Sequence, residues 1–470
     1  MEHKYLVAIE IGSSKIKGAV GAIDETGILN VCAIEERNLV DCVRHGNIQN
    51  VEEVKACVAE IISALESRAN IAPRKVTGVY VALGGRSMMS CKRDIEMTFD
   101  DETEITAEVI DRLLDESKLE VLEDKEIVDV VPMGFSVDNM AHQIPIGTYG
   151  HSLKASLNII ACRPQIVKNI NRVIEERLQL DINGYKVRQV ALSQLVLSAE
   201  EKKLGCVLVD FGAETTTVSI HKNDALQCLV TIPMGSRNIT RDLTSLGITE
   251  ESAERLKCQQ ANANSQETIG QGGKSTILEN VDDAVFNNYV QYRAGEIAFN
   301  IASQIKQAGF KPADLTGGIV IVGQGAKLHG FNAVLEFHTS LKVRNGMIST
   351  MVHISDGRVL PGDALDVIAI LLAASKGKGA LDCLEGIVQE RQVQPIAIED
   401  SNDDEGDDSR IKSGFIDDDI IEDDDIEETP KKPVKQPKQP KQPSRAAQIL
   451  GKIKVYVGEY LKEDSDGYDD

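Results

Sequence analysis

Two segments decide the fold, YLVAIEIGSSKIKGAVG at residues 5–21 and CVLVDFGAETTTVSIH at residues 206–221. They align without gaps at an offset of 200 residues, which places Glu10 on Asp210. Each segment is typical of an apolar strand that ends in an acid, followed by a glycine turn with small or hydroxyl residues and then a second strand. The repeat therefore predicts two copies of one β-hairpin, and with them two related halves of the chain.

Each predicted hairpin has the residues of a phosphate-binding turn. Glycine lets backbone N–H groups approach an anion closely, and hydroxyl groups add hydrogen-bond donors. A carboxylate at the end of the strand is suited to holding a hydrated divalent cation. Two such turns facing each other would bind the phosphates of a nucleotide between the halves. An ordinary hairpin with a glycine turn is the alternative for either copy alone, and the duplication favours the phosphate site.

The composition excludes several classes of protein. The chain has 470 residues, 51 Lys and Arg against 74 Asp and Glu, and a formal net charge of −23. This acidity argues against nucleic acid as a ligand. No apolar run reaches the roughly 20 residues that a membrane-spanning helix needs. The 9 cysteines include no CxxC pair, which argues against a zinc site and favours reduced thiols in the cytoplasm.

Strand-like and helix-like patterns alternate through most of the chain, which predicts an α/β fold. The spacing of apolar residues predicts helices over 51–69, 107–118 and 285–309, and strands over 76–85, 127–137 and 155–162. A buried strand that runs into a glycine-rich turn is predicted over 317–331. Segment 84–162 has a helix and strands of its own, so we expect an inserted subdomain there.

The charge pattern changes sharply near the C-terminus. Residues 399–429 hold 16 acids and 2 basic residues, whereas residues 430–445 hold 6 basic residues and no acid. Such blocks bury too little apolar surface to offset the entropy of ordering, so we expect a disordered charged linker over 399–445. Residues 463–470 make an acidic end.

Between linker and end, residues 446–462 have the pattern of an amphipathic helix. The residues that we expect to contact a membrane are Ile449, Leu450, Ile453, Tyr456, Val457, Tyr460 and Leu461, with Lys452 and Lys454 beside them. The segment is too short and too charged to cross a bilayer, so it is predicted to lie in the membrane interface, favoured by anionic lipid. Packing on a partner protein, or back on the body of the chain, is the alternative.

The two hairpins and the segment IVIVGQGAKLHGF (319–331) resemble the phosphate-1, phosphate-2 and adenosine motifs of the actin-like ATPase superfamily. Within it, the chain closely resembles the FtsA family of bacterial cell-division proteins over essentially residues 1–380 and again at the C-terminus. The resemblance rests on EIGSSKI, on EIT followed by VPMGFSVD, and on PIGTYGHSLKA and ITEESAERLK. It implies an actin-like duplicated two-domain ATPase fold with an FtsA-type inserted subdomain, a disordered tail and an amphipathic helix.

The resemblance also implies a division into subdomains. Domain 1A would comprise 1–83 and 163–200, inserted subdomain 1C 84–162, domain 2A 201–245 and 316–398 with a closing helix, and subdomain 2B 246–315.

ATP and Mg²⁺ are implied by the resemblance in the cleft between the halves. Asp210 would orient metal-bound water with Glu10 facing it, and Lys15 would be the point charge on the phosphates. The other implied nucleotide contacts are Gly12, Ser13, Ser14, Gly212, Thr215, Glu254, Lys257, Gly323 and Gly325. For Glu254 and Lys257, an ordinary pair one helical turn apart is an equal alternative.

The second turn departs from the family pattern, which more often has successive glycines there. Glu214 would place a carboxylate near the phosphates unless the loop turns it outward. Residues 190–194 hold no carboxylate to orient an attacking water, which leaves Gln189 or Gln194 as candidates. We therefore expect an ATP-binding assembly protein that is at most a slow ATPase.

By resemblance, the protein self-assembles into a polymer and tethers filaments of the tubulin-like protein FtsZ to the cytoplasmic face of the inner membrane at the division site. The C-terminal peptide of FtsZ would dock on the subdomain that contains the predicted helix over 285–309, with Arg293 as a contact. Later division proteins would bind subdomain 1C. A small-molecule kinase or an actin-like chaperone of the same superfamily is the alternative. Neither a catalytic acid for the first nor a substrate domain for the second is recognisable.

Overall fold

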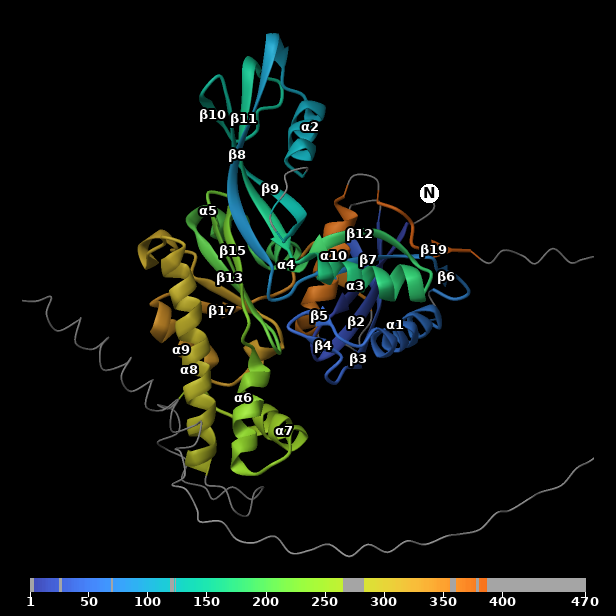
Figure 1. Cartoon of the computed structure of the whole chain (residues 1–470), viewed down its shortest axis with the longest axis vertical. Coiled ribbons are helices and arrows are strands. Elements are labelled where there is room, and N and C mark those ends of the chain that lie inside the picture. Colours follow the sequence, from blue (N-terminus) through green and yellow to red (C-terminus); the bar gives the residue numbers. More distant parts are fainter. Residues whose placement is uncertain are drawn as a thin grey trace, which may run out of the picture. The chain divides into compact units, whose positions relative to one another are not determined.

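Both predicted hairpins are present (Figure 1). In the computed structural model, β1 (Tyr5–Ile11) pairs antiparallel with β2 (Lys15–Ile23), and β13 (Cys206–Phe211) pairs antiparallel with β14 (Thr216–Lys222). All four strands are almost wholly buried, as expected for strands covered on both faces.

The two turns close in the same way. The N–H of Gly12 donates to the carbonyl of Lys15, and the N–H of Gly212 donates to the carbonyl of Thr215, both over 2.9 Å. These matching bonds stand at the offset of 200 residues found in the sequence, so the structural duplication is confirmed.

The structure describes residues 4–24, 28–68, 71–118, 122, 124–264, 283–355, 361–377 and 380–386. These belong to one compact unit, Met1–Val388. The predicted linker over 399–445, the amphipathic helix over 446–462 and the acidic end over 463–470 lie outside the described residues. Within the described ranges, no helix combines the length and apolar character that crossing a bilayer requires.

The first half is built on a mixed six-stranded sheet. Its order is β12 (Asp181–Val187), β7 (Gly78–Leu83), β1, β2, β3 (Leu29–Asn38) and β18 (Val352–Ile354). β7 runs parallel to β1, whereas β2 runs antiparallel to both β1 and β3. Two short strands, β4 (Val43–Arg44) and β5 (Asn47–Ile48), form a separate hairpin, and β6 (Lys75–Val76) pairs with β19 (Leu384–Glu385).

The second half repeats this arrangement within a nine-stranded sheet. Its order is β10 (Met140–His142), β9 (Glu126–Val137), β11 (Tyr149–Cys162), β8 (Met89–Glu104), β15 (Ala225–Ile232), β14, β13, β16 (Ile319–Val322) and β17 (Val343–Asn345). β16 runs parallel to β13, as β7 runs parallel to β1. The run β16–β13–β14–β15 thus has the same order and directions as β7–β1–β2–β3.

The predicted insertion forms a unit with its own small core. It contains β8, α2 (Ala107–Lys118), β9, β10 and β11, with Ile105, Leu113 and Leu157 fully buried among them. Although its chain enters and leaves through the first half, its sheet extends that of the second half (Figure 1). The seam is narrow: Met89 pairs with Val230, and the N–H of Leu229 donates to Ser90 Oγ over 2.8 Å.

The predicted helices form with ends shifted by at most three residues. They are α1 (Val51–Glu66), α2 and α8 (Asp283–Gln307). α1 begins where the sequence supplies a cap, because the side chain of Asn50 accepts a hydrogen bond from the N–H of Glu53. The remaining helices are α3 (Pro164–Asn171), α4 (Arg188–Val196), α5 (Ala199–Leu204), α6 (Ser236–Leu243), α7 (Glu250–Gln260), α9 (Phe331–Thr339) and α10 (Leu365–Ser375), with a π-helical turn over Arg172–Arg177 and short 3₁₀ turns at Thr244–Leu246, Pro312–Asp314, Gln324–Lys327 and Pro361–Asp363.

The last part of the folded chain contacts both halves. The expected division gives residues 316–398 to the return of domain 2A and a closing helix. β16 and β17 pair in the sheet of the second half, whereas β18 joins the sheet of the first half and α10 packs in the same core as β1 and β2. The physical reason is that α10 is apolar nearly all round, so it is stable only between layers. It lies against α4 and against β1, β2 and β7.

Candidate functional site

Both glycine turns line one cleft between the halves. Most of the residues expected there are brought together, namely Glu10, Gly12, Ser13, Ser14, Lys15, Asp210, Gly212, Thr215 and Gly323. The cleft also takes residues from the β4–β5 turn, from the starts of α4 and α10, and from Gly84 and Gly85. The sequence repeat therefore predicts the place where the halves meet.

The turn after β16 needs glycine for its packing. A Cβ on Gly323, whose φ is +90°, would lie 2.5 Å from the carbonyl oxygen of Phe211, and a Cβ on Gly325 would lie 2.7 Å from the Phe211 ring. Gly323 lines the cleft, whereas Gly325 does not. These two glycines thus allow the turn to pack against the end of β13. Their packing on Phe211 does not depend on whether an adenine base binds beside them.

An arginine lies between the two acids of the repeat. Arg188, the first residue of α4, places Nη1 2.7 Å from Oε1 of Glu10 and Nη2 2.8 Å from Oδ2 of Asp210. The side chains of Glu10 and Asp210 are only 4% and 7% exposed, and that of Arg188 is 16% exposed. One buried positive charge of the chain itself therefore offsets part of the negative charge of the two acids.

A second buried cation lies on the same side of the first hairpin. Lys17 is paired in register with Glu10 across the strands, and its Nζ is 2.6 Å from Oδ2 of Asp366 and 2.7 Å from the carbonyl of Asp363. Lys15, which the resemblance makes the point charge, lines the rim of the cleft and pairs with Glu36 over 2.7 Å. Lys17 is the more deeply buried of the two, with 5% of its side chain exposed against 33%.

The charges of the cleft perturb one another. Burial raises the pKa of Glu10 to about 7 and Asp366 adds to the rise, while Arg188 and Lys17 act in the opposite direction. Burial by itself would lower the pKa of Lys17, but the carboxylates of Asp366 and Glu10 raise it above its ordinary value. Lys17 therefore stays charged at neutral pH.

The carboxylate of Glu214 is held by hydrogen bonds and ion pairs within the chain. Its Oε2 accepts the N–H of His45 over 2.7 Å, and its Oε1 lies 2.9 Å from Nη2 of Arg241 and 3.5 Å from Nη1 of Arg237. Burial would raise the pKa of Glu214, but the N–H of His45, the His45 side chain and the two arginines more than offset it and hold the pKa below its usual value.

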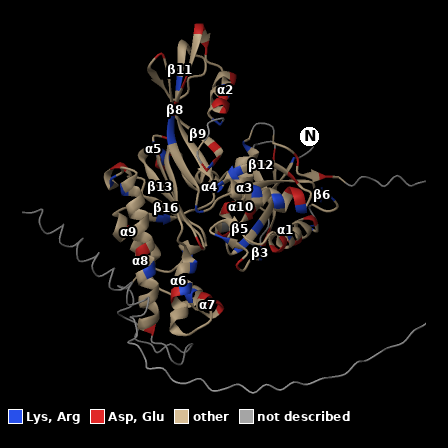
Figure 2. Ribbon diagram, in the orientation of Figure 1, with Lys and Arg blue, Asp and Glu red and all other residues tan. Residues whose placement is uncertain are grey.

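The turn between β4 and β5 touches both glycine turns. While the N–H of His45 bonds to Glu214 in the second turn, the N–H of Gly46 donates to Ser13 Oγ in the first over 3.2 Å. The carboxylate of Glu214 therefore joins the first half to α6 of the second half. Figure 2 shows the basic residues of α6 beside acidic residues of the neighbouring helices.

The donor set does not fit a resident divalent cation. Mg²⁺ prefers oxygen ligands in octahedral geometry, and the two carboxylates that could supply them face a guanidinium instead. The buried Asp210 Oδ2 accepts no well-aligned hydrogen bond and has only this charge contact. In the described part of the chain, no three His, Cys, Asp or Glu side chains come close enough together to hold a metal ion.

Known proteins with related sequences identify the family. A family model described as "Cell division protein FtsA" matches residues 207–370, and one described as "SHS2 domain inserted in FTSA" matches residues 85–161. The cell division protein FtsA of Porphyromonas gingivalis is 32% identical over 352 residues, which cover 73% of each chain. The chain belongs to the FtsA family of cell-division proteins.

Further relatives agree with the membership of the FtsA family. The cell division protein FtsA of Neisseria meningitidis is 28% identical over 404 residues, which cover 83% of this chain and 95% of the relative. Among solved structures, the PilM–PilN type IV pilus biogenesis complex matches with a TM-score of 0.55 at 14% identity and covers 79% of this chain and 99% of that chain. The likeness to the pilus biogenesis complex concerns the fold alone. With the matched insertion it confirms the predicted actin-like duplicated fold with an FtsA-type inserted subdomain.

Two other implied nucleotide contacts of the FtsA family have structural partners here. Lys257 is buried, and its Nζ lies 2.7 Å from Oε2 of Glu254, 2.9 Å from Thr240 Oγ1 and 3.2 Å from the carbonyl of Ser236. These bonds hold α7 against α6, and neither Glu254 nor Lys257 lines the cleft. Glu254 and Lys257 therefore form the ion pair one helical turn apart that is the alternative to a nucleotide contact.

The remaining polar residues singled out in the sequence are also engaged or remote. Gln189 is buried, and its Nε2 donates to the carbonyl of Leu208 and to Ser219 Oγ, each over 2.9 Å, while Gln194 is exposed outside the cleft. Neither is placed to orient water there. Arg293 on α8 has a side chain only 14% exposed, because it pairs with Asp242 and Glu296.

Sequence reasoning missed Arg188, Lys17 and Asp366. Arg188 stands 22 residues before Asp210 at the start of a helix, and no local pattern connects the two. Lys17 had a signal, because it lies seven residues after Glu10 and a tight hairpin turn pairs such residues across antiparallel strands.

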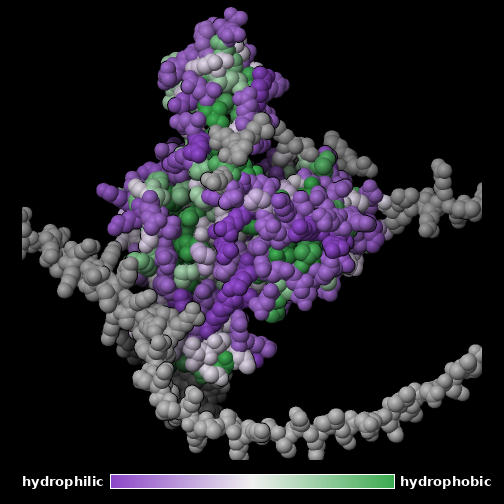
Figure 3. Space-filling view, viewed as in Figure 1, coloured by the Kyte–Doolittle hydropathy of each residue, from purple (hydrophilic) through white to green (hydrophobic). Residues whose placement is uncertain are grey.

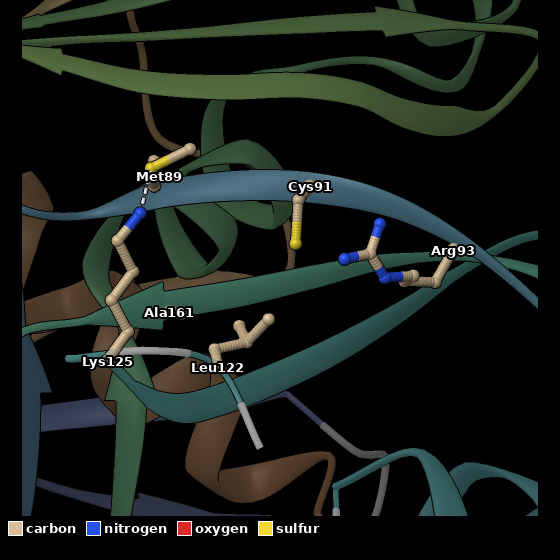
Figure 4. Close-up of a pocket in the computed structure, with 6 residues that line it drawn as sticks. All are labelled: Met89, Cys91, Arg93, Leu122, Lys125 and Ala161. Atoms are coloured by element: carbon tan, nitrogen blue, oxygen red, sulfur yellow. Dashed lines mark hydrogen bonds between the residues drawn. The ribbon is translucent and has the colours of Figure 1, made fainter. Parts of the chain in front are cut away.

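A second cavity lies at the base of the insertion (Figure 4). It has a volume of about 170 Å³ and is lined by Met89, Cys91, Arg93, Leu122, Lys125 and Ala161. The Nζ of Lys125 approaches Met89 Sδ to 2.7 Å, and none of the described residues that line the space has a carboxylate or a hydroxyl group. It shares no lining residue with the cleft.

Proposed function

We propose that this cell-division protein binds ATP in the cleft, self-assembles, and tethers FtsZ filaments to the inner face of the cytoplasmic membrane. The observation that carries the proposal is the meeting of both glycine turns at one cleft. Two turns with matching backbone hydrogen bonds and with hydroxyl side chains, facing one cleft, favour an elongated polyanion over a small neutral substrate.

Residues from both halves of the chain would contact the phosphates. The first turn would offer the hydroxyls of Ser13 and Ser14, and the second would offer the hydroxyl of Thr215. Lys17 and Arg188 supply positive charge from the floor. Glu214 lines the cleft, but its carboxylate is bound by His45 and Arg241, which would offset its repulsion of the phosphates. We propose no binding residues for Mg²⁺, because Arg188 lies between the two carboxylates that would hold it.

Attachment to the membrane is assigned to the C-terminal segment. The amphipathic residues of 446–462 would insert into the interface, and the 6 basic residues of 430–445 would add attraction to anionic lipid. Each such anchor is weak by itself, but a polymer presents many of them at once. FtsZ would contribute its C-terminal peptide, docked near α7 and α8, and later division proteins would bind the insertion. The apolar areas on the face shown in Figure 3 are small and separate, as expected if attachment relies on the tail.

Replacing Ser14 by Glu tests the cleft. The wild type is expected to bind ATP, and S14E to bind it at least about tenfold more weakly, because a carboxylate in the first turn repels the phosphates. The measurement is isothermal titration calorimetry of the full chain with ATP. S63E, the same change on the exposed face of α1, is the matched control and should leave the affinity unchanged. Equal ATP affinity in S14E and the wild type would place the nucleotide elsewhere.

Tyr456→Trp tests the anchor, because the chain contains no Trp. We expect the fluorescence of Trp at this position to shift to the blue with anionic vesicles, less at high salt and less on neutral vesicles. Changing Ile453 and Val457 to Asp in the same background should abolish the shift. Emission that stays water-like at saturating anionic lipid would favour a protein partner for this segment.

A further inference from the structure

We propose that the guanidinium of Arg188 takes the place of a divalent cation between Glu10 and Asp210, so that the cleft holds polyphosphate without needing a divalent metal ion. The polyphosphate part rests on the proposed ATP binding. The exclusion of metal by Arg188 does not, and it is testable on the nucleotide-free protein.

The geometry gives Arg188 the contacts that a bridging cation would have. Each of its two terminal nitrogens faces a different carboxylate, at 2.7 Å for Glu10 and 2.8 Å for Asp210. The acids come from matching positions of the two halves, so one guanidinium crosslinks the halves as a shared metal ion would. A cation placed between the same oxygens would have to displace it.

The position of Arg188 in its helix points the same way. It is the first residue of α4, after the N-cap residue Val187. A positive side chain at a helix N-terminus is unfavourable, because the N–H groups there carry partial positive charge. The carboxylates of Glu10 and Asp210 offset that cost.

The cleft floor has one carboxylate more than it has cations, so a further cation is opposed by the place that Arg188 occupies and not by the net charge. Three carboxylates, those of Glu10, Asp210 and Asp366, face two cations, Arg188 and Lys17. A divalent cation would have to leave Arg188 buried without a partner, which is costly. A guanidinium has five N–H groups, so Arg188 has donors left for phosphate oxygens, with which it forms strong forked hydrogen bonds.

Direct binding of Mn²⁺, followed by electron paramagnetic resonance, tests this without nucleotide. The full-length wild type should show only the background of its acidic segment, 399–429, whereas R188Q should gain one site at least about tenfold tighter. R188Q/D210N should lose that site, because it removes a ligand and keeps the acidic segment. A cleft site of equal affinity in the wild type and R188Q would overturn the proposal, as would its absence from R188Q.

Loss of Arg188 leaves two buried acids unpaired, so folding is followed in parallel. The melting temperature of R188Q is expected to fall and to recover on adding Mn²⁺ or Mg²⁺, while that of the wild type does not respond. R188K is the second variant, because it keeps a positive charge and is expected to fold and to exclude Mn²⁺ as the wild type does. Mn²⁺ bound between the acids of R188K as tightly as in R188Q would contradict the counter-ion role.

The nucleotide arm compares ATP affinity in Mg²⁺ and in EDTA. The wild type should change by less than about threefold, whereas R188Q should bind at least about tenfold more weakly in EDTA than in Mg²⁺. A tenfold loss by the wild type in EDTA would overturn the proposal. If no variant binds ATP in either buffer, the proposed function fails, and the Mn²⁺ titration still decides the role of Arg188.

Discussion

Replacing Lys17 by Met is expected to lower the free energy of unfolding by about 3 kcal/mol, because it leaves Asp366 in a largely buried site without its ion-pair partner. Met nearly matches the lysine stem in volume, so lost packing adds little. The measurement is urea unfolding of the full chain, followed by circular dichroism.

Lys15→Met is the matched control, since it makes the same change two residues earlier on the same strand. Lys15 pairs with Glu36 where both side chains are more than 30% exposed, and such pairs contribute about 0–1 kcal/mol. If the two variants lose equal stability, Lys17 does not have the buried role that its contacts indicate. Comparing ATP affinities of the same two proteins also shows which lysine serves the phosphates.

Glu214→Gln is expected to cost about 2–4 kcal/mol of unfolding free energy, because an amide cannot accept at both oxygens and would turn an NH₂ group toward a donor. In the wild type, one oxygen of Glu214 accepts the N–H of His45 on one side of the cleft, and the other oxygen faces Arg241 and Arg237 on the other side. Amide hydrogen exchange at His45 should therefore accelerate in the variant, in addition to the loss of stability.

Glu250→Gln is the control for Glu214, because Glu250 also faces Arg237 but is half exposed and 3.8 Å away. It should change the unfolding free energy by less than about 0.5 kcal/mol. The pKa of Glu214 is lowered in the folded state. Its contribution is therefore present above the ordinary carboxyl pKa, about 4.3, and is lost as the pH falls through the lowered pKa. A difference between wild type and E214Q that persists well below pH 4 would mean that charge is not the cause.

The repeat predicted the hairpins and their meeting place because each signal is local. An apolar strand, a glycine turn and an apolar strand specify themselves, and duplication implies that their ends face each other. The helices were predictable for the same reason, as the residues of α2 and α8 repeat with one helical period. The insertion over 84–162 was predicted from its own helix and strand patterns, and the resemblance to the FtsA family added its type.

The electrostatics of the cleft could not be predicted in this way. Lys15 and Lys17 lie two residues apart on one strand and share a face, so alternation cannot say which is buried; distance from the strand end decides it. Arg188 and Asp366 begin two helices that meet only in the folded protein. Glu214 appeared to face the phosphates because its partners, His45 and Arg241, are far away in the sequence.

The insertion is fastened to both halves, covalently to the first and by strand pairing to the second at Met89 and Val230. β8 runs 16 residues from this seam, which at about 3.3 Å per residue makes an arm of roughly 50 Å. A rotation of the halves by 5° would move the far end of such an arm by roughly 4 Å. Any rotation of the halves relative to each other would therefore produce its largest displacement at the tip of the insertion, comparable at this angle to the spacing between two strands.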